Sequence, residues 1–154
     1  MQLVGFNFKK ILVERNNLAR FNKAGNVSLG IKNVEKENIS LLKDEEALKF
    51  EFNYSINHKV DEALSDKNSS KKNEEFNGIL FEGNLVMAAT KEEADLIMKA
   101  WGKNEIEKSV YESLCNIILR KCVSKAVLLT DELGLPLPVL VPKMSLEAKQ
   151  QQST

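Results

Sequence analysis

The chain has 154 residues, enough for one domain with a hydrophobic core. Its 22 Lys and Arg residues equal its 22 Asp and Glu residues, so the formal net charge is zero and no basic excess supports nucleic-acid binding. The opening MQLVGFNFKKI has no signal-peptide core, and no run approaches the roughly 18 apolar residues of a membrane helix. We therefore expect a cytoplasmic protein with no nucleic-acid partner and no membrane insertion.

The first half of the chain has the period of two that is typical of β-strands. The clearest segment is LKFEFNYSINHKV, residues 48–60, in which mainly apolar and polar residues alternate along the whole length. In FNFKKILV, residues 6–13, the phase breaks near Lys9 and Lys10. This break predicts a β-bulge that redirects the strand.

Two further segments have the same pattern. They are NVSLGI, residues 26–31, and GILFEGNLVMAA, residues 78–89, where Gly83 predicts a bend. The polar residues 64–77 contain no apolar anchors in their centre and predict a long hairpin loop.

The second half predicts two helices. Thr90 and Glu93 have the spacing of a capping box. Apolar residues then follow at helical spacing: Ala94, Ile97, Met98 and Trp101. Gly102 is expected to end this short helix.

A longer helix is predicted from about Glu105 to Leu133. Most of residues 110–129 are apolar, and a helix that is apolar over most of its girth is buried on more than one side. The second cover is either another subunit or the segment that follows. Cys115 and Cys122 are seven residues apart on this helix, too far for a disulfide, and we interpret them as buried small apolar residues.

The chain then continues as ELGLPLPVLVPKM, residues 132–144, which holds Pro136, Pro138 and Pro142. Proline fixes φ and removes a backbone donor, so we expect an extended apolar segment rather than helix or central strand. Residues 145–154 are polar and are predicted to be a disordered tail. We expect residues 1–144 to form a single domain.

Strands followed by helices predict an α+β fold, with a four-stranded antiparallel sheet followed by a short and a long helix packed on one face. This order of elements resembles that of the SecB-like chaperones, which include the export chaperone SecB and its archaeal and toxin-associated relatives. The segments that carry the resemblance are FNFKKILVER, LKFEFNYSINHKV, GILFEGNLVMAAT, EKSVYESLCNIILRKCVSKAVLL and GLPLPVLVPKM. They cover roughly residues 5–144.

The resemblance implies an ATP-independent holdase, a chaperone without cofactors that binds unfolded polypeptide clients along apolar grooves. It also implies a homodimer or homotetramer with long helices at its interface, for which the candidates are Ile118, Leu119, Cys122, Val123 and Val127. The candidates for binding clients are Met98, Trp101, Leu135, Leu137, Val139 and Leu140. The alternative for the proline-bearing segment is that it caps the core.

The chain departs from the family in two respects. SecB is strongly acidic and docks a translocation motor through an acidic sheet surface, whereas this chain is neutral. SecB also has a final helix, where this chain has only SLEAKQQQST. We therefore do not extend the resemblance to docking with that motor.

Two other classes of function compete with a holdase. The chain shows no Gly-rich phosphate loop and no catalytic constellation, and its only histidine, His58, has the parity of the apolar strand residues. We therefore expect that the protein is not an enzyme. An oligomeric adaptor or subunit that binds one specific protein partner remains the alternative.

Overall fold

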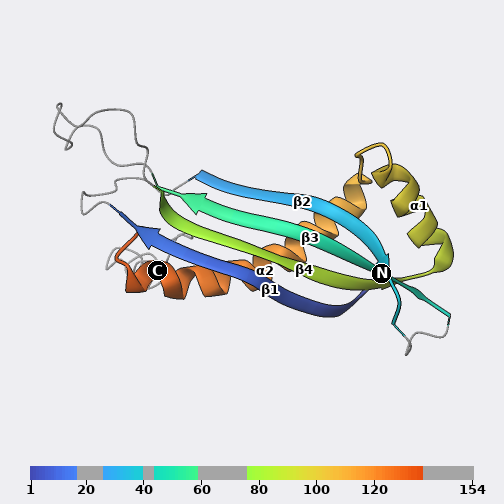
Figure 1. Ribbon diagram of the computed structural model, residues 1–154, viewed down its shortest axis with the longest axis horizontal. Helices are drawn as coiled ribbons and strands as arrows, with labels where there is room; N and C mark the ends of the chain where they lie inside the picture. Colours follow the sequence, from blue (N-terminus) through green and yellow to red (C-terminus); the bar gives the residue numbers. More distant parts are fainter. Residues whose placement is uncertain (17–25, 40–43, 59–75, 137–154) are drawn as a thin grey trace, which may run out of the picture.

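The computed structural model describes residues 1–16, 26–39, 44–58 and 76–136. These residues form four strands followed by two helices (Figure 1). The elements are β1 (Gln2–Arg15), β2 (Asn26–Glu37), β3 (Glu46–Asn57), β4 (Asn77–Ala89), α1 (Lys91–Trp101) and α2 (Lys108–Glu132). The predicted α+β class is confirmed, because an antiparallel sheet of four strands precedes a short and a long helix.

The strands lie in the order β1-β4-β3-β2, so the first two strands of the chain form the two edges of the sheet. A register shift between Phe8 and Lys10 confirms the predicted bulge in β1, and a second shift follows Leu3. β2 continues past the predicted end at Ile31 with another shift, and it ends at Glu37. Each edge strand is therefore irregular, at different places along its length.

Gly83 lies in β4 beside the bulge of β1. A Cβ atom there would overlap the carbonyl oxygen of Asn7 and come within 3.0 Å of the Phe52 ring. Glycine is therefore required here by the close approach of the neighbouring backbone.

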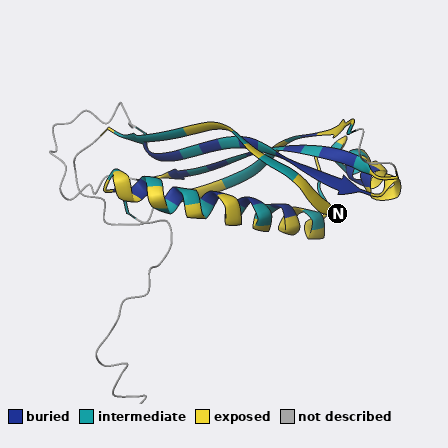
Figure 2. Cartoon of the chain, turned by 90° about the horizontal axis from the view of Figure 1, so that it is seen from below, coloured by how far each residue is buried: buried dark blue, intermediate teal, exposed yellow. Residues whose placement is uncertain are grey.

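Helix α2 covers one face of the sheet as a separate layer (Figure 2). Its fully buried residues recur every fourth position: Leu114, Ile118, Cys122, Ala126 and Thr130. They pack against the buried row of β3 and its neighbours in β4, which includes Phe50, Phe52, Tyr54, Ile56 and Phe81. One row of the helix and one face of the sheet thus form the core.

The helix crosses the sheet obliquely (Figure 1). Its second half lies against β1, where the Lys125 ammonium group is 4.7 Å from the centre of the Phe8 ring. At its end, Arg15 Nη1 donates a hydrogen bond of 2.7 Å to the carbonyl oxygen of Leu133. A helix is about 10 Å wide and four strands span roughly 19 Å, so α2 covers only part of this face.

The ends of both helices have identifiable causes. The predicted capping box is confirmed, since Thr90 Oγ1 accepts from the Glu93 N–H and the Glu93 carboxylate accepts from the Thr90 N–H. Helix α1 ends at Gly102, which has a right-handed conformation; the left-handed residue is Asn104, with φ 58°. After α2, Gly134 takes the left-handed conformation with φ 66°.

The opposite face of the sheet carries charged and polar side chains. The Lys49 ammonium group is 2.6 Å from a Glu35 carboxylate oxygen, and that of Lys32 is 3.9 Å from Glu82. Neither helix in the described ranges is long and apolar enough to cross a membrane. The predicted loop, apart from Phe76 and Asn77, and the predicted tail lie outside the described residues.

Candidate functional site

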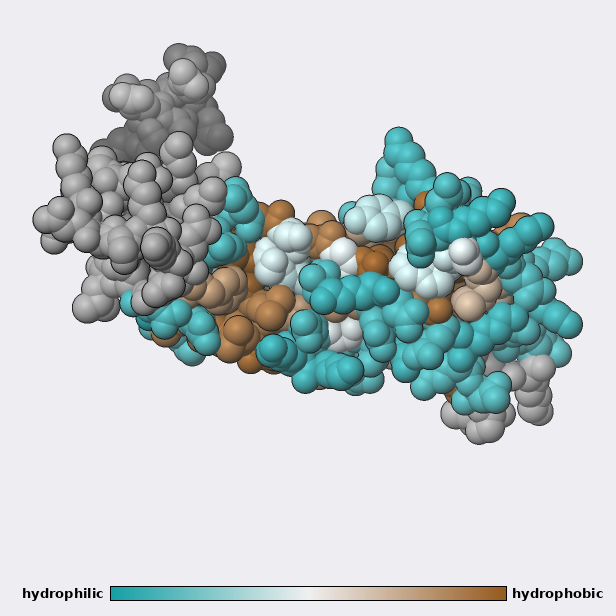
Figure 3. Space-filling model, turned by 45° about the horizontal axis from the view of Figure 1, so that its top comes forward, coloured by the Kyte–Doolittle hydropathy of each residue, from teal (hydrophilic) through white to brown (hydrophobic). Residues whose placement is uncertain are grey.

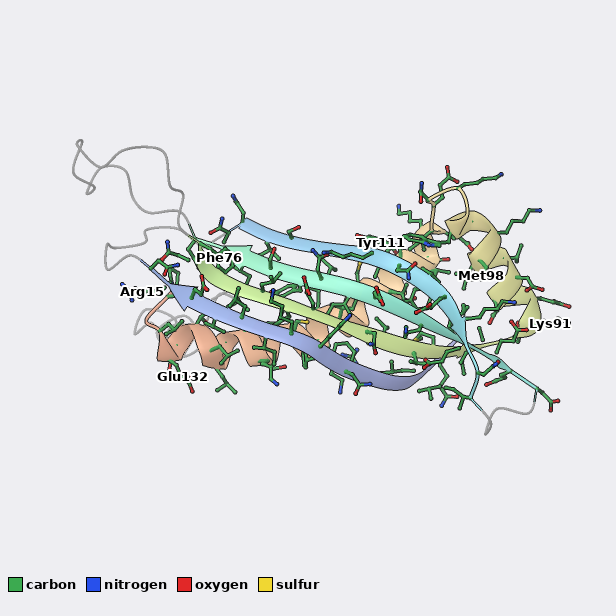
Figure 4. All side chains as sticks on the ribbon, viewed as in Figure 1. Arg15, Phe76, Lys91, Met98, Tyr111 and Glu132 are labelled. Atoms are coloured by element: carbon green, nitrogen blue, oxygen red, sulfur yellow. The ribbon has the colours of Figure 1, made fainter. Side chains whose placement is uncertain are left out.

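A groove of about 460 Å³ lies between α1 and the start of α2, at one end of the sheet. Figure 4 labels Met98 on α1 and Tyr111 in the first turn of α2, the two helices that form it. The groove is lined by Met1, Glu93, Leu96, Ile97, Ala100, Ile106, Glu107, Ser109, Val110 and Ser113. Most of these side chains are apolar, and the polar ones are two carboxylates and two hydroxyls.

The groove forms where apolar side chains of α1 do not pack into the core. Ala94 and Ile97 are buried against the sheet, whereas Leu96 lies off this face and is 68% exposed. The turn through Asn104 then brings Ile106 and Val110 to the open side of α1. An exposed leucine between two helices therefore forms one wall of an apolar depression.

Met1, which directly precedes β1, is also part of the groove lining. Its ammonium group lies 3.9 Å from a Glu93 carboxylate oxygen, and the Met1 side chain is only 11% exposed. The other carboxylate, Glu107, accepts a hydrogen bond of 3.1 Å from the Ser109 hydroxyl. The groove therefore offers mainly apolar contact, with two carboxylates and two hydroxyls as its polar groups.

A second apolar surface lies along one flank of α2. Lys125 faces β1, and the helical repeat of 3.6 residues places the opposite flank towards β2. That flank carries Tyr111, Cys115, Leu119, Val123 and Val127, all exposed or half-buried. Figure 3, which views the β2 edge, shows hydrophobic atoms gathered over the middle of the molecule and hydrophilic atoms around α1.

The structure separates the five residues predicted at an oligomer interface. Ile118 and Cys122 are fully buried against the sheet of their own chain, so the prediction that they face a partner is corrected. Leu119, Val123 and Val127 lie on the half-buried flank, where a second chain has access to them. The four-residue spacing of both rows explains the error, because the sequence pattern alone does not show which row meets the sheet.

The residues predicted to bind clients also lie in different environments. Met98 and Trp101 are half-buried and pack against the core, and neither lines the groove. Leu135 is buried and its N–H donates to the Thr130 carbonyl oxygen at 2.9 Å, so it belongs to the core rather than to an open wall. Leu137, Val139 and Leu140 lie outside the described residues.

Sequence analysis missed the residues that do line the groove. Leu96 is an apolar residue on the polar face of the short helix, outside the spacing of Ala94, Ile97 and Trp101. This position was the one sequence feature that could have indicated an exposed apolar site. Met1 and Ile106 carry no such signal, because their position depends on how β1 and the turn before α2 meet α1.

Cys122 and His58 are two further side chains of chemical interest, and both are buried. Burial raises the pKa of the Cys122 thiol to about 12, which keeps it protonated and unreactive. His58 is buried on the core side of β3, as its parity predicted, and its backbone N–H donates to the Asn77 carbonyl oxygen at 2.7 Å. In the described ranges no group of His, Cys, Asp and Glu side chains is arranged to hold a metal ion.

No protein-family model, curated protein or solved structure matches this chain.

Proposed function

We propose that this protein is a cytoplasmic, ATP-independent holdase of the SecB-like type, which binds unfolded or non-native polypeptides on exposed apolar surface. The observation that carries the proposal is the groove between α1 and α2, where a 68% exposed leucine stands beside Ile106 and Val110. Exposed apolar surface of this kind on a folded chain is typical of sites that bind other polypeptides.

The composition of the groove favours varied clients over one small ligand. Its walls are mostly aliphatic, and its polar side chains already have hydrogen-bond partners within the chain, as Glu93 has in the capping box and Glu107 has in Ser109. Such a surface imposes no fixed pattern of hydrogen bonds, so it can accept different apolar side chains.

A homodimer or homotetramer is part of the proposal. The flank of Leu119, Val123 and Val127 is apolar and half-buried, and contact with a second copy would remove it from water.

Aggregation of a chemically denatured test protein, measured by light scattering without nucleotide, tests the proposal. We expect the wild type to suppress aggregation and Leu96→Asp to suppress it several-fold less, because a few central apolar contacts dominate such binding. Leu128→Asp is the matched control, since Leu128 is also 68% exposed and lies near the other end of α2. Equal suppression by both variants would remove the groove from the proposal.

The alternative function is an oligomeric adaptor that binds one specific folded partner. Native and denatured forms of the same test proteins distinguish the two functions. A holdase binds many denatured proteins and few native ones. An adaptor binds one native protein and does not bind the denatured proteins.

A further inference from the structure

The two edge strands of the sheet are protected to different degrees against pairing with another chain. Edge strands present unpaired N–H and C=O groups, and proteins block them with bulges and lysine side chains. In β1, two register shifts fall within the first ten residues, and Lys9 lies within the second shift with Lys10 directly after it. Lys125 of α2 adds a further cation over Phe8 on the same side. The first ten residues of β1 are therefore poorly suited to pair with another chain.

The first half of β2 has none of this protection. Residues 26–31, NVSLGI, contain no charged side chain and no proline, and their pairing with β3 is continuous from Asn26 to Ile31. The shift and the charges come later, from Lys32 to Glu37. Among the described residues, β2 pairs with β3 only, so its other edge carries unpaired backbone groups.

The side chains of this segment alternate in a way that suits an added strand. Val27, Leu29 and Ile31 pair with Ile56, Tyr54 and Phe52 and so lie on the core face of the sheet. Because α2 crosses towards β1 at this end, Val27 is 53% exposed and the other two are half-buried. A strand added to β2 would place every second side chain next to this apolar row.

We infer that residues 26–31 of β2 bind an extended segment of a non-native polypeptide as a fifth strand. Backbone hydrogen bonds supply binding that any sequence can make, and the apolar row selects segments with alternating apolar residues. The inference rests on the proposed holdase function and gives it a second binding surface, distant from the groove at α1.

A second copy of this chain fits the segment less well. Six residues of strand are about 20 Å long and cover on the order of 200 Å² at a width of about 10 Å, against roughly 800 Å² per partner in a stable interface. Two copies paired through β2 would also keep their α2 helices apart, because β2 and β3 of each copy would lie between them. A single extended segment needs no larger contact.

Binding of a labelled synthetic peptide of alternating valine and threonine tests the inference. A matched peptide is N-methylated at two adjacent central residues, which removes one donor from each of its edges. We expect the methylated peptide to bind wild-type protein about tenfold more weakly, because strand addition depends on these donors. Amide exchange at residues 26–31 should slow when the unmethylated peptide is added.

Val27→Lys should weaken binding of the unmethylated peptide by a similar factor, since an edge lysine opposes strand addition. Ile11→Lys is the control, because Ile11 is 44% exposed on the other edge strand. Equal binding of the two peptides to wild-type protein would overturn the inference, whether or not Val27→Lys folds. If wild type suppresses aggregation in that case, the holdase proposal survives without this surface.

Two other results would also overturn the inference. Slow exchange at residues 26–31 in the free protein that disappears on dilution would assign the edge to a second copy. Slow exchange that disappears when residues 137–154 are deleted would assign it to the chain's own C-terminal segment.

Discussion

The ammonium group of Lys36 lies 2.8 Å from a carboxylate oxygen of Asp95 and joins the far end of β2 to α1. The same ammonium group is 2.9 Å from Glu46 on β3, so one lysine connects three elements. This exposed contact adds to the burial of Ala94 and Ile97, which packs α1 against the end of the sheet.

Asp95→Asn should loosen α1 from the sheet without unfolding the domain. The Lys36 hydrogen bond lowers the pKa of Asp95, so the stabilisation is present at neutral pH and is lost as pH falls through the lowered pKa. We expect faster amide exchange in α1 at neutral pH, and no difference from wild type at acid pH or in 1 M salt, where exposed ion pairs are screened. Asp131→Asn, an exposed change on α2, is the control.

Thr90→Ala should destabilise the protein by about 1 kcal/mol, because it leaves an N-terminal N–H of α1 without its acceptor. Thr90→Ser keeps the oxygen and should restore most of the loss. Urea unfolding monitored by circular dichroism gives both values. A Thr90→Ala protein as stable as wild type would show that the cap contributes nothing.

Val123→Glu should shift an oligomer towards monomer, since a carboxylate within an apolar interface loses hydration without gaining a partner. Sedimentation velocity at several concentrations measures the shift. Ser124→Glu introduces the same charge at the next, exposed position and should leave the assembly unchanged. A wild type that is monomeric at every concentration would contradict this part of the proposal.

The thiol of Cys122 should resist iodoacetamide in the folded protein up to about pH 9, because burial raises its pKa from the ordinary 9.0 to about 12. Above pH 9 the thiol of the unfolded chain loses its proton, whereas the thiol of the folded chain keeps it. Deprotonation therefore favours the unfolded chain, and the free energy of unfolding decreases as the pH rises from 9 towards 12. The stability difference between wild type and Cys122→Ala should therefore shrink over that range. Mass spectrometry of alkylated peptides, with the half-buried Cys115 as internal reference, measures the reactivity.

The period-two and period-3.6 patterns were sufficient to predict the elements of the fold. The bulge after Phe8 and the Thr90 capping box were also predictable, because each depends on residues close together in sequence. The path of α2 over the sheet was not, because it depends on contacts such as that between Lys125 and Phe8.

The candidate site was harder to predict for the same reason. Ile118 and Leu119 are equally apolar neighbours, yet the first is buried in the core and the second lies on the open flank. Which row of a helix meets the sheet is decided by tertiary packing. The groove likewise combines residues of β1, α1 and α2 that no sequence period connects.

The strand order has a consequence for synthesis on the ribosome. β1 is made first, but its partner among the described strands is β4, the last strand of the sheet, so β1 has no partner strand until β4 has emerged. At about 5–20 residues per second, this delay lasts several seconds. During that time the nascent chain exposes an unpaired apolar strand, which other chains can contact until β4 has been made.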